Sequence, residues 1–213
     1  MIQERAEEYL GAIYRLRIDK LSPVPLSQLT DYFGFSPVSI HEMVKKLSQQ
    51  DWVTYHPYHG VTLTNHGEEI AEALLRRHRL WERFLTDILD VSWAEAHEIA
   101  GRLEHAAPEL VTERLSEFMG MPERCPHGGP IPPLTKNATD QCLASLPAGA
   151  QGYVTRISPE LPELLHQIQE WGVVPKSFLH VVHQEEAKTT IERDDQIIHI
   201  PKNNAQTIWV KLR

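Results

Sequence analysis

Arg77-His78-Arg79-Leu80-Trp81-Glu82 is the stretch around which the rest of this chain is organised. His78 and Glu82 are four residues apart, so on a helix their side chains lie on one face, one turn from each other. His97 and Glu104 are seven residues apart, about two turns, and share a stripe in the same way. Two such stripes on neighbouring helices can surround a divalent metal ion. Solvated polar residues on amphipathic helices have the same spacing, so spacing alone leaves both interpretations open.

Composition limits the class of protein. The chain has 213 residues, of which 41% are hydrophobic and 23% charged, enough for one large domain or two small ones. Its net charge of -8 argues against a protein that coats nucleic acid, although a local basic patch remains possible. Cys125 and Cys142 lie outside any C-x-x-C spacing, which favours a reducing cytoplasm without disulfides. We expect a cytoplasmic protein with no membrane span and no signal peptide.

The segment before this stretch predicts a winged helix-turn-helix. A short amphipathic helix over residues 26–33 is followed by a tight turn. Ser36 then caps a second helix whose first position is Pro37, where the missing N–H costs nothing. Two β-type runs, at 52–55 and 61–64, form a hairpin that serves as the wing.

The second helix of this unit is expected to enter the major groove of a double-stranded DNA operator. Polar residues near its N-terminus would reach base edges or waters, and its serine and lysines would contact phosphates. The candidate DNA-contacting residues are Ser36, Pro37, Ser39, His41, Glu42, Lys45 and Lys46. A winged helix that makes only protein contacts is the alternative.

Three amphipathic helices are predicted to follow the wing. The first covers residues 67–89. The next begins at Ser92, forms a capping box with Glu95 and continues to Ala107, and Pro108 opens the third. Their broad apolar surfaces suit a homodimer, because a two-fold dimer matches a two-fold operator.

Taken together, these segments resemble a known family. The winged helix-turn-helix is followed by Arg76-Arg77-His78-Arg79-Leu80-Trp81-Glu82-Arg83-Phe84-Leu85, by His97 and Glu104-His105, and by Cys125-Pro126-His127-Gly128-Gly129-Pro130-Ile131-Pro132. This order is similar to that of the diphtheria toxin repressor family, the metal-dependent iron and manganese repressors of bacteria. The resemblance covers about residues 6–133 and implies a metal-activated repressor of metal-uptake genes. The Cys-Pro-His-Gly stretch also looks like a metal motif, but the resemblance implies a Pro-rich turn, so we interpret Cys125 and His127 as structural residues.

The C-terminal segment predicts a small β domain. A short helix at 161–171 and alternating strands up to residue 211 look like the SH3-like, FeoA-type barrel of larger family members. The expected fold class is therefore mainly α with a small β domain. The expected limits are 1–66 for the winged helix-turn-helix, 67–134 for a helical metal-binding and dimerisation domain, 135–141 for a linker and 142–213 for the β-barrel.

The resemblance implies two metal sites. The first would use His78, Glu82 and His97, completed by Glu160 and Glu163 from the β domain, with His166 as a substitute candidate. The second would use Glu8, Glu104 and His105. Gly101 stands where the family has a Cys or Glu ligand, so the second site lacks one side chain. Glu8 also has an alternative role, since carboxylates in the first turns of a helix stabilise its dipole.

The ligand types bear on the metal. Imidazoles and carboxylates without a thiolate suit Mn(II) and Fe(II) better than softer ions. Glu8, where iron-sensing relatives have Met, favours Mn(II), with Fe(II) as the other possibility. We expect no enzymatic activity and no small-molecule substrate. Two alternatives remain from other classes: a DNA-binding regulator whose metal response has degenerated, and a metalloenzyme in which the ion activates water.

Overall fold

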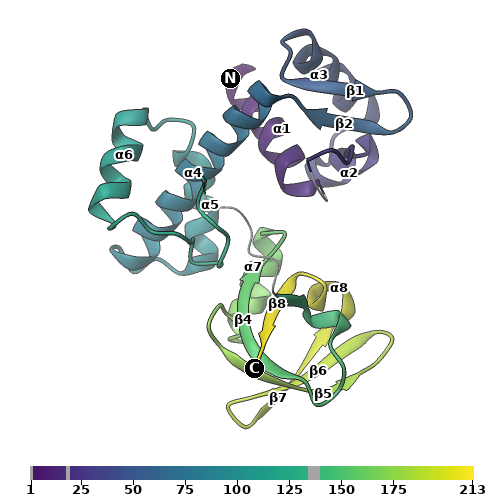
Figure 1. Ribbon diagram of the computed structural model, residues 1–213, viewed down its shortest axis with the longest axis vertical. Coiled ribbons are helices and arrows are strands. Elements are labelled where there is room, and N and C mark those ends of the chain that lie inside the picture. The colour runs from purple at the N-terminus through teal and green to yellow at the C-terminus, as the bar shows by residue number, and fades with distance from the viewer. Residues whose placement is uncertain (1, 18–19, 134–139) are drawn as a thin grey trace. The chain divides into compact units, whose positions relative to one another are not determined.

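The computed structural model describes residues 2–17, 20–133 and 140–213 (Figure 1). The chain divides into two compact units, Met1–Arg77 and His78–Arg213. The mainly helical architecture with a small β domain confirms the expected fold class. The domain limits expected from the sequence stay predictions, and most of the expected linker, residues 135–139, lies outside the described residues.

The first unit is a winged helix-turn-helix. Its two strands pair antiparallel, with Val53 opposite Leu63, one residue removed from the runs predicted from the sequence. Its core consists of fully buried aliphatic residues, among them Leu10, Ile13, Leu29, Ile40 and Leu47. The elements are α1 (Ile2–Leu16), α2 (Leu26–Phe33), α3 (Pro37–Gln49), β1 (Val53–His56), β2 (Gly60–Leu63) and the first part of α4 (Asn65–Asp87).

Local sequence signals place α3. Helix α2 ends at Phe33 and is capped by Gly34, whose φ of 66° is the left-handed conformation that glycine adopts without strain. The Ser36 hydroxyl then accepts a hydrogen bond from the backbone N–H of Ser39 at 3.2 Å, and Pro37 occupies the first helical position. The predicted cap and helix start are therefore confirmed.

The helical part of the second unit contains the rest of α4, α5 (Trp93–Leu103) and α6 (Glu109–Phe118). The predicted cap of α5 is confirmed, because the Glu95 backbone N–H donates to the Ser92 hydroxyl at 3.3 Å. The predicted continuation of α5 to Ala107 is wrong. The helix ends at Leu103, and residues 104–106 form a turn in which Glu104 bonds with another helix instead. Helix α4 likewise ends at Asp87, two residues before the predicted end.

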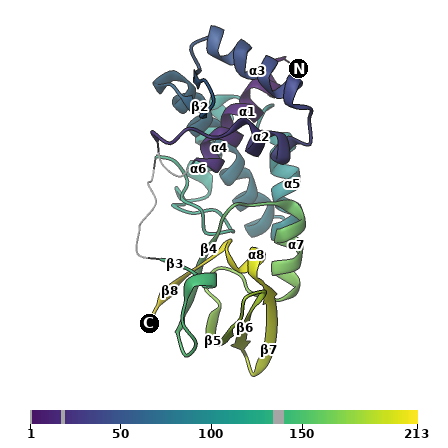
Figure 2. The same ribbon diagram turned by 90° about the vertical axis from the view of Figure 1, so that its right-hand side faces the viewer.

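The β domain is one six-stranded antiparallel sheet with the strand order β3-β8-β4-β5-β6-β7. Helix α7 covers its core and also packs against α5, as Figure 2 shows, so that Trp93 and Ala94 share a hydrophobic cluster with Leu165 and Ile168. The strands are β3 (Gln141–Cys142), β4 (Gln151–Ile157), β5 (Phe178–Gln184), β6 (Lys188–Arg193), β7 (Gln196–Pro201) and β8 (Ile208–Leu212). The helices are η1 (Leu143–Ser145), α7 (Pro162–Glu170) and α8 (Lys202–Ala205).

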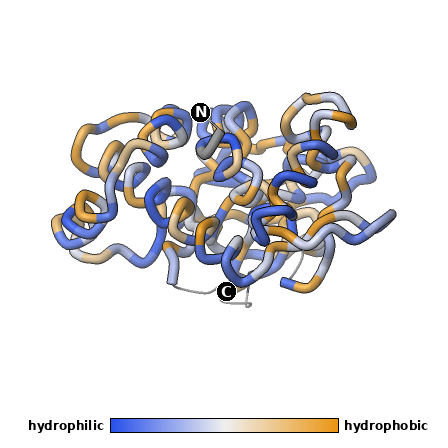
Figure 3. Tube along the Cα trace, turned by 90° about the horizontal axis from the view of Figure 1, so that it is seen from above, coloured by the Kyte–Doolittle hydropathy of each residue, from blue (hydrophilic) through white to orange (hydrophobic). Residues whose placement is uncertain are grey.

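Hydrophobic and hydrophilic residues alternate along the helices (Figure 3). Within the described residues, no helix is both long enough and apolar enough to cross a membrane.

Candidate metal centre

Three residues predicted as ligands meet between α4 and α5. The Oε1 atom of Glu82 lies 2.9 Å from Nε2 of His78 and 2.7 Å from Nδ1 of His97. The two imidazole nitrogens are 3.0 Å apart. His78 is 2% exposed and Glu82 is fully buried, so the polar atoms face one another away from solvent. His78 and Glu82 therefore lie on one face of α4, as their spacing of four residues predicted.

Glu104 fixes the orientation of His78. Its Oε2 atom lies 2.6 Å from Nδ1 of His78. Because an ionised carboxylate only accepts hydrogen bonds, Nδ1 carries a proton and donates it to Glu104. In the metal-free cluster Nε2 is also protonated and donates to Oε1 of Glu82 at 2.9 Å, and it would give up this proton to bind a metal ion. Such a carboxylate behind a histidine is the usual outer partner of a metal-binding imidazole.

The β domain contributes Glu160 to this cluster. Glu160 lies just before α7, is 8% exposed, and belongs with His78, Glu82 and His97 to a set whose ligand atoms lie within 4.8 Å of one another. Arg79 holds it through an ion pair of 3.4 Å. Glu163, in contrast, is exposed on the first turn of α7 and is outside this set.

Two residues interpreted as structural from the sequence also lie against Glu82. His127 is fully buried, and its Nδ1 atom is 3.2 Å from Oε1 of Glu82. Its Nε2 atom donates to the backbone carbonyl of Trp93 at 2.9 Å. The Sγ atom of Cys125 is 3.9 Å from Nδ1 of His127 and 3.8 Å from Oε1 of Glu160. The Cys-Pro-His spacing is the sequence feature that indicates their role as potential ligands, because a thiol and an imidazole two residues apart in a turn can bind the same ion.

The metal-free cluster is held together by protons. Burial opposes the charged form of His78, but the charges and hydrogen bonds of Glu82 and Glu104 outweigh it and raise the pKa to about 9. Burial likewise disfavours the Glu82 carboxylate, yet the neighbouring His127 and His78 hold its pKa well below the usual value. Burial and two carboxylates raise the pKa of the Cys125 thiol to about 11. A metal ion that binds here therefore displaces protons.

The chemistry of the cluster fits a divalent transition metal. Among the described residues, the buried Oε2 atom of Glu82 has no hydrogen-bond partner, although buried polar atoms are normally satisfied. Around it converge imidazole nitrogens, carboxylate oxygens and one thiol, which are ligands for first-row divalent ions. An ion would satisfy the orphan oxygen and replace the displaced protons.

The residues predicted for a second site lie in both units. Glu8 is exposed on α1 in the first unit. Glu104 and His105 follow α5 in the second unit, where Nε2 of His105 is 3.5 Å from Oε1 of Glu104. The space beside Gly101 is open: apart from Gly101 itself, its two chain neighbours and the nearby backbone of its own helix, no described heavy atom lies within 4 Å of where a Cβ would be. The second site stays a prediction.

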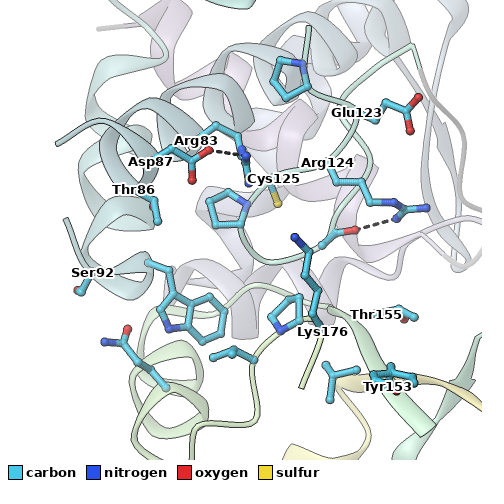
Figure 4. Close-up of a pocket in the computed structure, with 18 of the residues that line it drawn as sticks. Arg83, Thr86, Asp87, Ser92, Glu123, Arg124, Cys125, Tyr153, Thr155 and Lys176 are labelled. Carbon is cyan, nitrogen blue, oxygen red and sulfur yellow. Dashed lines mark hydrogen bonds and ion pairs between the residues drawn. The ribbon is translucent and has the colours of Figure 1, made fainter. Parts of the chain in front are cut away.

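A cavity of about 1130 Å³ lies within the second unit, and the loop that carries Cys125 forms part of its wall (Figure 4). Arg83 and Ser92 border it from the helical part, and Tyr153 and Lys176 border it from the β domain. Cys125 thus lines this cavity as well as the cluster around Glu82.

Removing the partner of His78 tests the orientation described above. We expect Glu104→Ala to weaken metal binding at the Glu82 cluster by about 10- to 100-fold, because the imidazole loses its acceptor. Glu104→Gln should recover most of this loss, since an amide oxygen also accepts from Nδ1–H. Competition with a chromophoric chelator measures both, with the exposed Glu98→Ala as the control. If Gln is as weak as Ala, Glu104 acts on the metal by its charge and not by orienting His78.

Comparisons with known proteins agree with this geometry. Residues 1–61 match the iron dependent repressor N-terminal DNA binding domain, residues 64–133 the iron dependent repressor metal binding and dimerisation domain, and residues 141–212 the FeoA domain. An uncharacterized HTH-type transcriptional regulator of Methanocaldococcus jannaschii is 34% identical over 118 residues, which are 55% of this chain and 94% of that protein. The iron-dependent repressor IdeR of Mycobacterium tuberculosis is 28% identical over 195 residues, 84% of each chain.

Solved structures give the same result along the whole chain. A manganese-dependent transcriptional repressor in complex with manganese has a TM-score of 0.87 and 31% identity, with 98% of this chain and 100% of that chain covered. The manganese regulator SloR has a TM-score of 0.83 and 29% identity, with 98% of each chain covered. The chain therefore belongs to the diphtheria toxin repressor family of metal-dependent transcriptional regulators.

Proposed function

We propose that this chain is a metal-activated repressor that binds a palindromic operator as a homodimer and controls metal-uptake genes in the cytoplasm. The observation that carries the proposal is the buried donor cluster around Glu82, in a chain that also presents a winged helix-turn-helix. The family consists of transcriptional repressors and not of enzymes, which confirms that part of the expectation and removes the metalloenzyme alternative.

The proposed DNA-binding surface is the outer face of α3. Ile40, Val44 and Leu47 face the core, which leaves the other side of the helix exposed. The seven candidate DNA-contacting residues Ser36, Pro37, Ser39, His41, Glu42, Lys45 and Lys46 are all exposed. This arrangement supports contacts to base edges near the N-terminus of α3 and contacts of the lysines to phosphates.

The proposed dimer interface includes α6. Leu110 is 69% exposed, Phe118 is 67% exposed, and Met121 just beyond the helix is 73% exposed. An apolar surface of this kind marks an interaction site. The match of residues 64–133 to a dimerisation domain supports the same assignment.

For the activating metal we propose Mn(II), with Fe(II) as the alternative. The names of the relatives support both, since the mycobacterial relative is an iron-dependent repressor and the solved structures include manganese-dependent ones. The cluster around Glu82 also contains the Cys125 thiol, which was absent from the ligand set expected from the sequence. A thiol ligand also suits Zn(II), so this cluster alone does not favour Mn(II). The preference for Mn(II) therefore rests on Glu8 in the predicted second site.

We propose that metal binding raises DNA affinity by holding the segments of the second unit in a fixed arrangement. Glu82, Glu160, the Cys125 thiol and the imidazoles of His78, His97 and His127 would hold the ion, whose positive charge would offset the charge of the carboxylates. The ligands themselves come from α4, α5, the Cys125 loop and the residue before α7, so they fix these segments against one another. Helix α4 continues into the DNA-binding unit. A coupling of 1 to 3 kcal/mol, or about 5- to 150-fold in DNA affinity, is typical.

Fluorescence anisotropy with an operator duplex selected from a random library tests the proposal. Salt is held fixed because phosphate contacts make the affinity depend on it. We expect Mn(II), or anaerobic Fe(II), to raise the affinity at least tenfold over chelator alone. Equal affinity in all conditions would instead support a DNA-binding regulator with a degenerate metal response. Gly101, which lacks the ligand side chain of the family, is the observation that favours this second candidate.

A further inference from the structure

The large cavity in the second unit is almost entirely separate from the metal cluster. Its volume of about 1130 Å³ is slightly above the range of about 300 to 1,000 Å³ that is usual for small-molecule sites. The described residues that line it come from both the helical part and the β domain. Among them, only Cys125 also belongs to the groups of potential metal ligands around Glu82. The cavity is therefore a candidate site for a second kind of ligand.

Much of the wall of this cavity is apolar or aromatic. Val91 and Trp93 border it around the start of α5, and Val174 and Pro175 border it between α7 and β5. Tyr153 on β4 also lines it and is 49% exposed. Such walls take up an apolar body by the hydrophobic effect, and aromatic side chains favour a flat one. The cavity therefore suits a ligand with an apolar, partly aromatic body.

Basic side chains provide a place for a negative charge. Lys176 extends from the β domain towards the loop that carries Cys125 (Figure 4), and its ammonium forms no ion pair with any described residue. Arg83 pairs with Asp87 through one terminal nitrogen, which leaves further N–H donors on the planar guanidinium. Both side chains can donate to an acidic group of a ligand, and such charge-assisted hydrogen bonds are stronger than neutral ones.

Four carboxylates are among the described lining residues, but none of them neutralises Lys176. The one on α4 is already paired with the arginine of that helix. Asp140 accepts a hydrogen bond from Nε of Arg156 at 2.9 Å. Glu123 is directed away from Lys176 in Figure 4, and Asp90 is exposed to solvent. The charge that a ligand meets inside the cavity is therefore positive, which favours an anion over a cation.

Two lining residues connect the cavity with the metal cluster. The Sγ atom of Cys125 is 3.9 Å from Nδ1 of His127. The rings of Trp93 and His127 have centroids 4.7 Å apart, and the Trp93 carbonyl accepts a hydrogen bond from the same imidazole. A ligand packed against Trp93 and the Cys125 loop would restrain both. The cluster would then lose less conformational freedom when it binds an ion.

From these observations we propose that the cavity is an effector site for an amphiphilic organic monoanion, and that this ligand raises the affinity of the cluster for metal. The apolar body packs against Trp93 and Pro175, and the acidic group binds Lys176 and Arg83. Only the second half of the inference rests on the proposed metal-dependent function. Because coupling between two ligands is reciprocal, bound metal raises the affinity for the anion by the same factor.

The probe for the site is anilinonaphthalene sulfonate, an aromatic monoanion that fluoresces more strongly on apolar surfaces. Titrated into the full metal-free chain, it should show saturable binding of one molecule per chain. Lys176→Gln should weaken this binding at least about tenfold, because it removes a hydrogen bond to a charged group. Val174→Phe should weaken it by filling part of the cavity. Lys188→Gln, on β6 and outside the cavity, is the matched control and should bind as wild type does.

No saturable binding, or equal binding by wild type and both cavity variants, would overturn the site. A charge series on the wild type needs no variant. Naphthoate, neutral naphthamide and cationic naphthylmethylammonium share one ring system and are compared as competitors of the probe. We expect the anion to compete at least about tenfold more strongly than the amide, and the cation to compete least. A cation that competes as strongly as the anion would overturn the assignment of the charge.

Isothermal titration calorimetry of naphthoate with and without saturating Mn(II) tests the coupling. We expect Mn(II) to tighten naphthoate binding by about fivefold or more. Equal affinity would overturn the regulatory half of the inference and leave the proposed function in place. If Mn(II) itself does not bind, the proposed function fails, whereas the metal-free titration still decides whether the anion site exists.

Discussion

Replacing Glu82 by Gln is expected to lower the affinity for the activating metal by at least about 100-fold, more than the loss of an outer partner costs. Glu82 is fully buried. It belongs to both groups of potential ligands in the cluster, the one with His78, His97 and Glu160 and the one with Cys125 and His127. Gln keeps the size of the side chain but removes the charge that attracts the ion and that stabilises the protonated His78 and His127. Chelator competition measures the affinity, and operator anisotropy should show that metal no longer raises DNA binding.

The control for this substitution is Glu163→Gln, a charge change of the same kind at an exposed position on α7. It should leave metal affinity within about twofold of wild type, since screened surface charges act weakly. Metal-activated operator binding that survives Glu82→Gln would show that the cluster does not regulate this protein. The predicted second site would then be the one that senses metal.

Phe118→Glu should convert the proposed dimer to a monomer at micromolar concentration. In a two-fold interface each substitution occurs twice, so two charges must be buried in an apolar surface. Phe118 is 67% exposed on α6 and contacts Phe84 with ring centroids 6.3 Å apart. We expect the dimer dissociation constant to rise at least about 100-fold, with a parallel loss of operator affinity. Sedimentation velocity measures the first and anisotropy the second.

Glu117→Ala on the same helix is the matched control, because Glu117 is exposed and forms a surface ion pair with Arg114 at 3.0 Å. It should leave the dimer intact, as exposed ion pairs contribute little. A Phe118→Glu protein that remains dimeric, with metal-activated DNA binding unchanged, would place the interface on a surface other than α6.

The sequence predicted the elements whose causes are local. The Ser36 cap with Pro37, and the Ser92 cap with Glu95, each depend on residues within one turn, and both are found in the structure. The face shared by His78 and Glu82 follows from helical spacing alone, and its ligand role was added by the resemblance. These features need no knowledge of how distant segments pack.

What the sequence did not predict depends on distant contacts. Helix α5 ends early where Glu104 bonds His78 of α4, a partner 26 residues away. Cys125 and His127 reach Glu82 because the loop is held by the Trp93 carbonyl, which no spacing rule encodes. The pairing of Glu160 with Glu163 assumed one helix for both, whereas α7 begins only at Pro162. Only Glu160 therefore points into the cluster.

The glycine at position 101 could be replaced by a ligand side chain without disturbing the packing around it. Outside its own stretch of helix, no described heavy atom lies within 4 Å of the place where its Cβ would be, and its backbone is helical. A side chain there would even favour the helix, by about 1 kcal/mol for Ala over Gly. No described side chain occupies the space that a ligand side chain at position 101 would need. The packing of this protein therefore leaves position 101 open to a larger side chain, including one that could bind a metal ion.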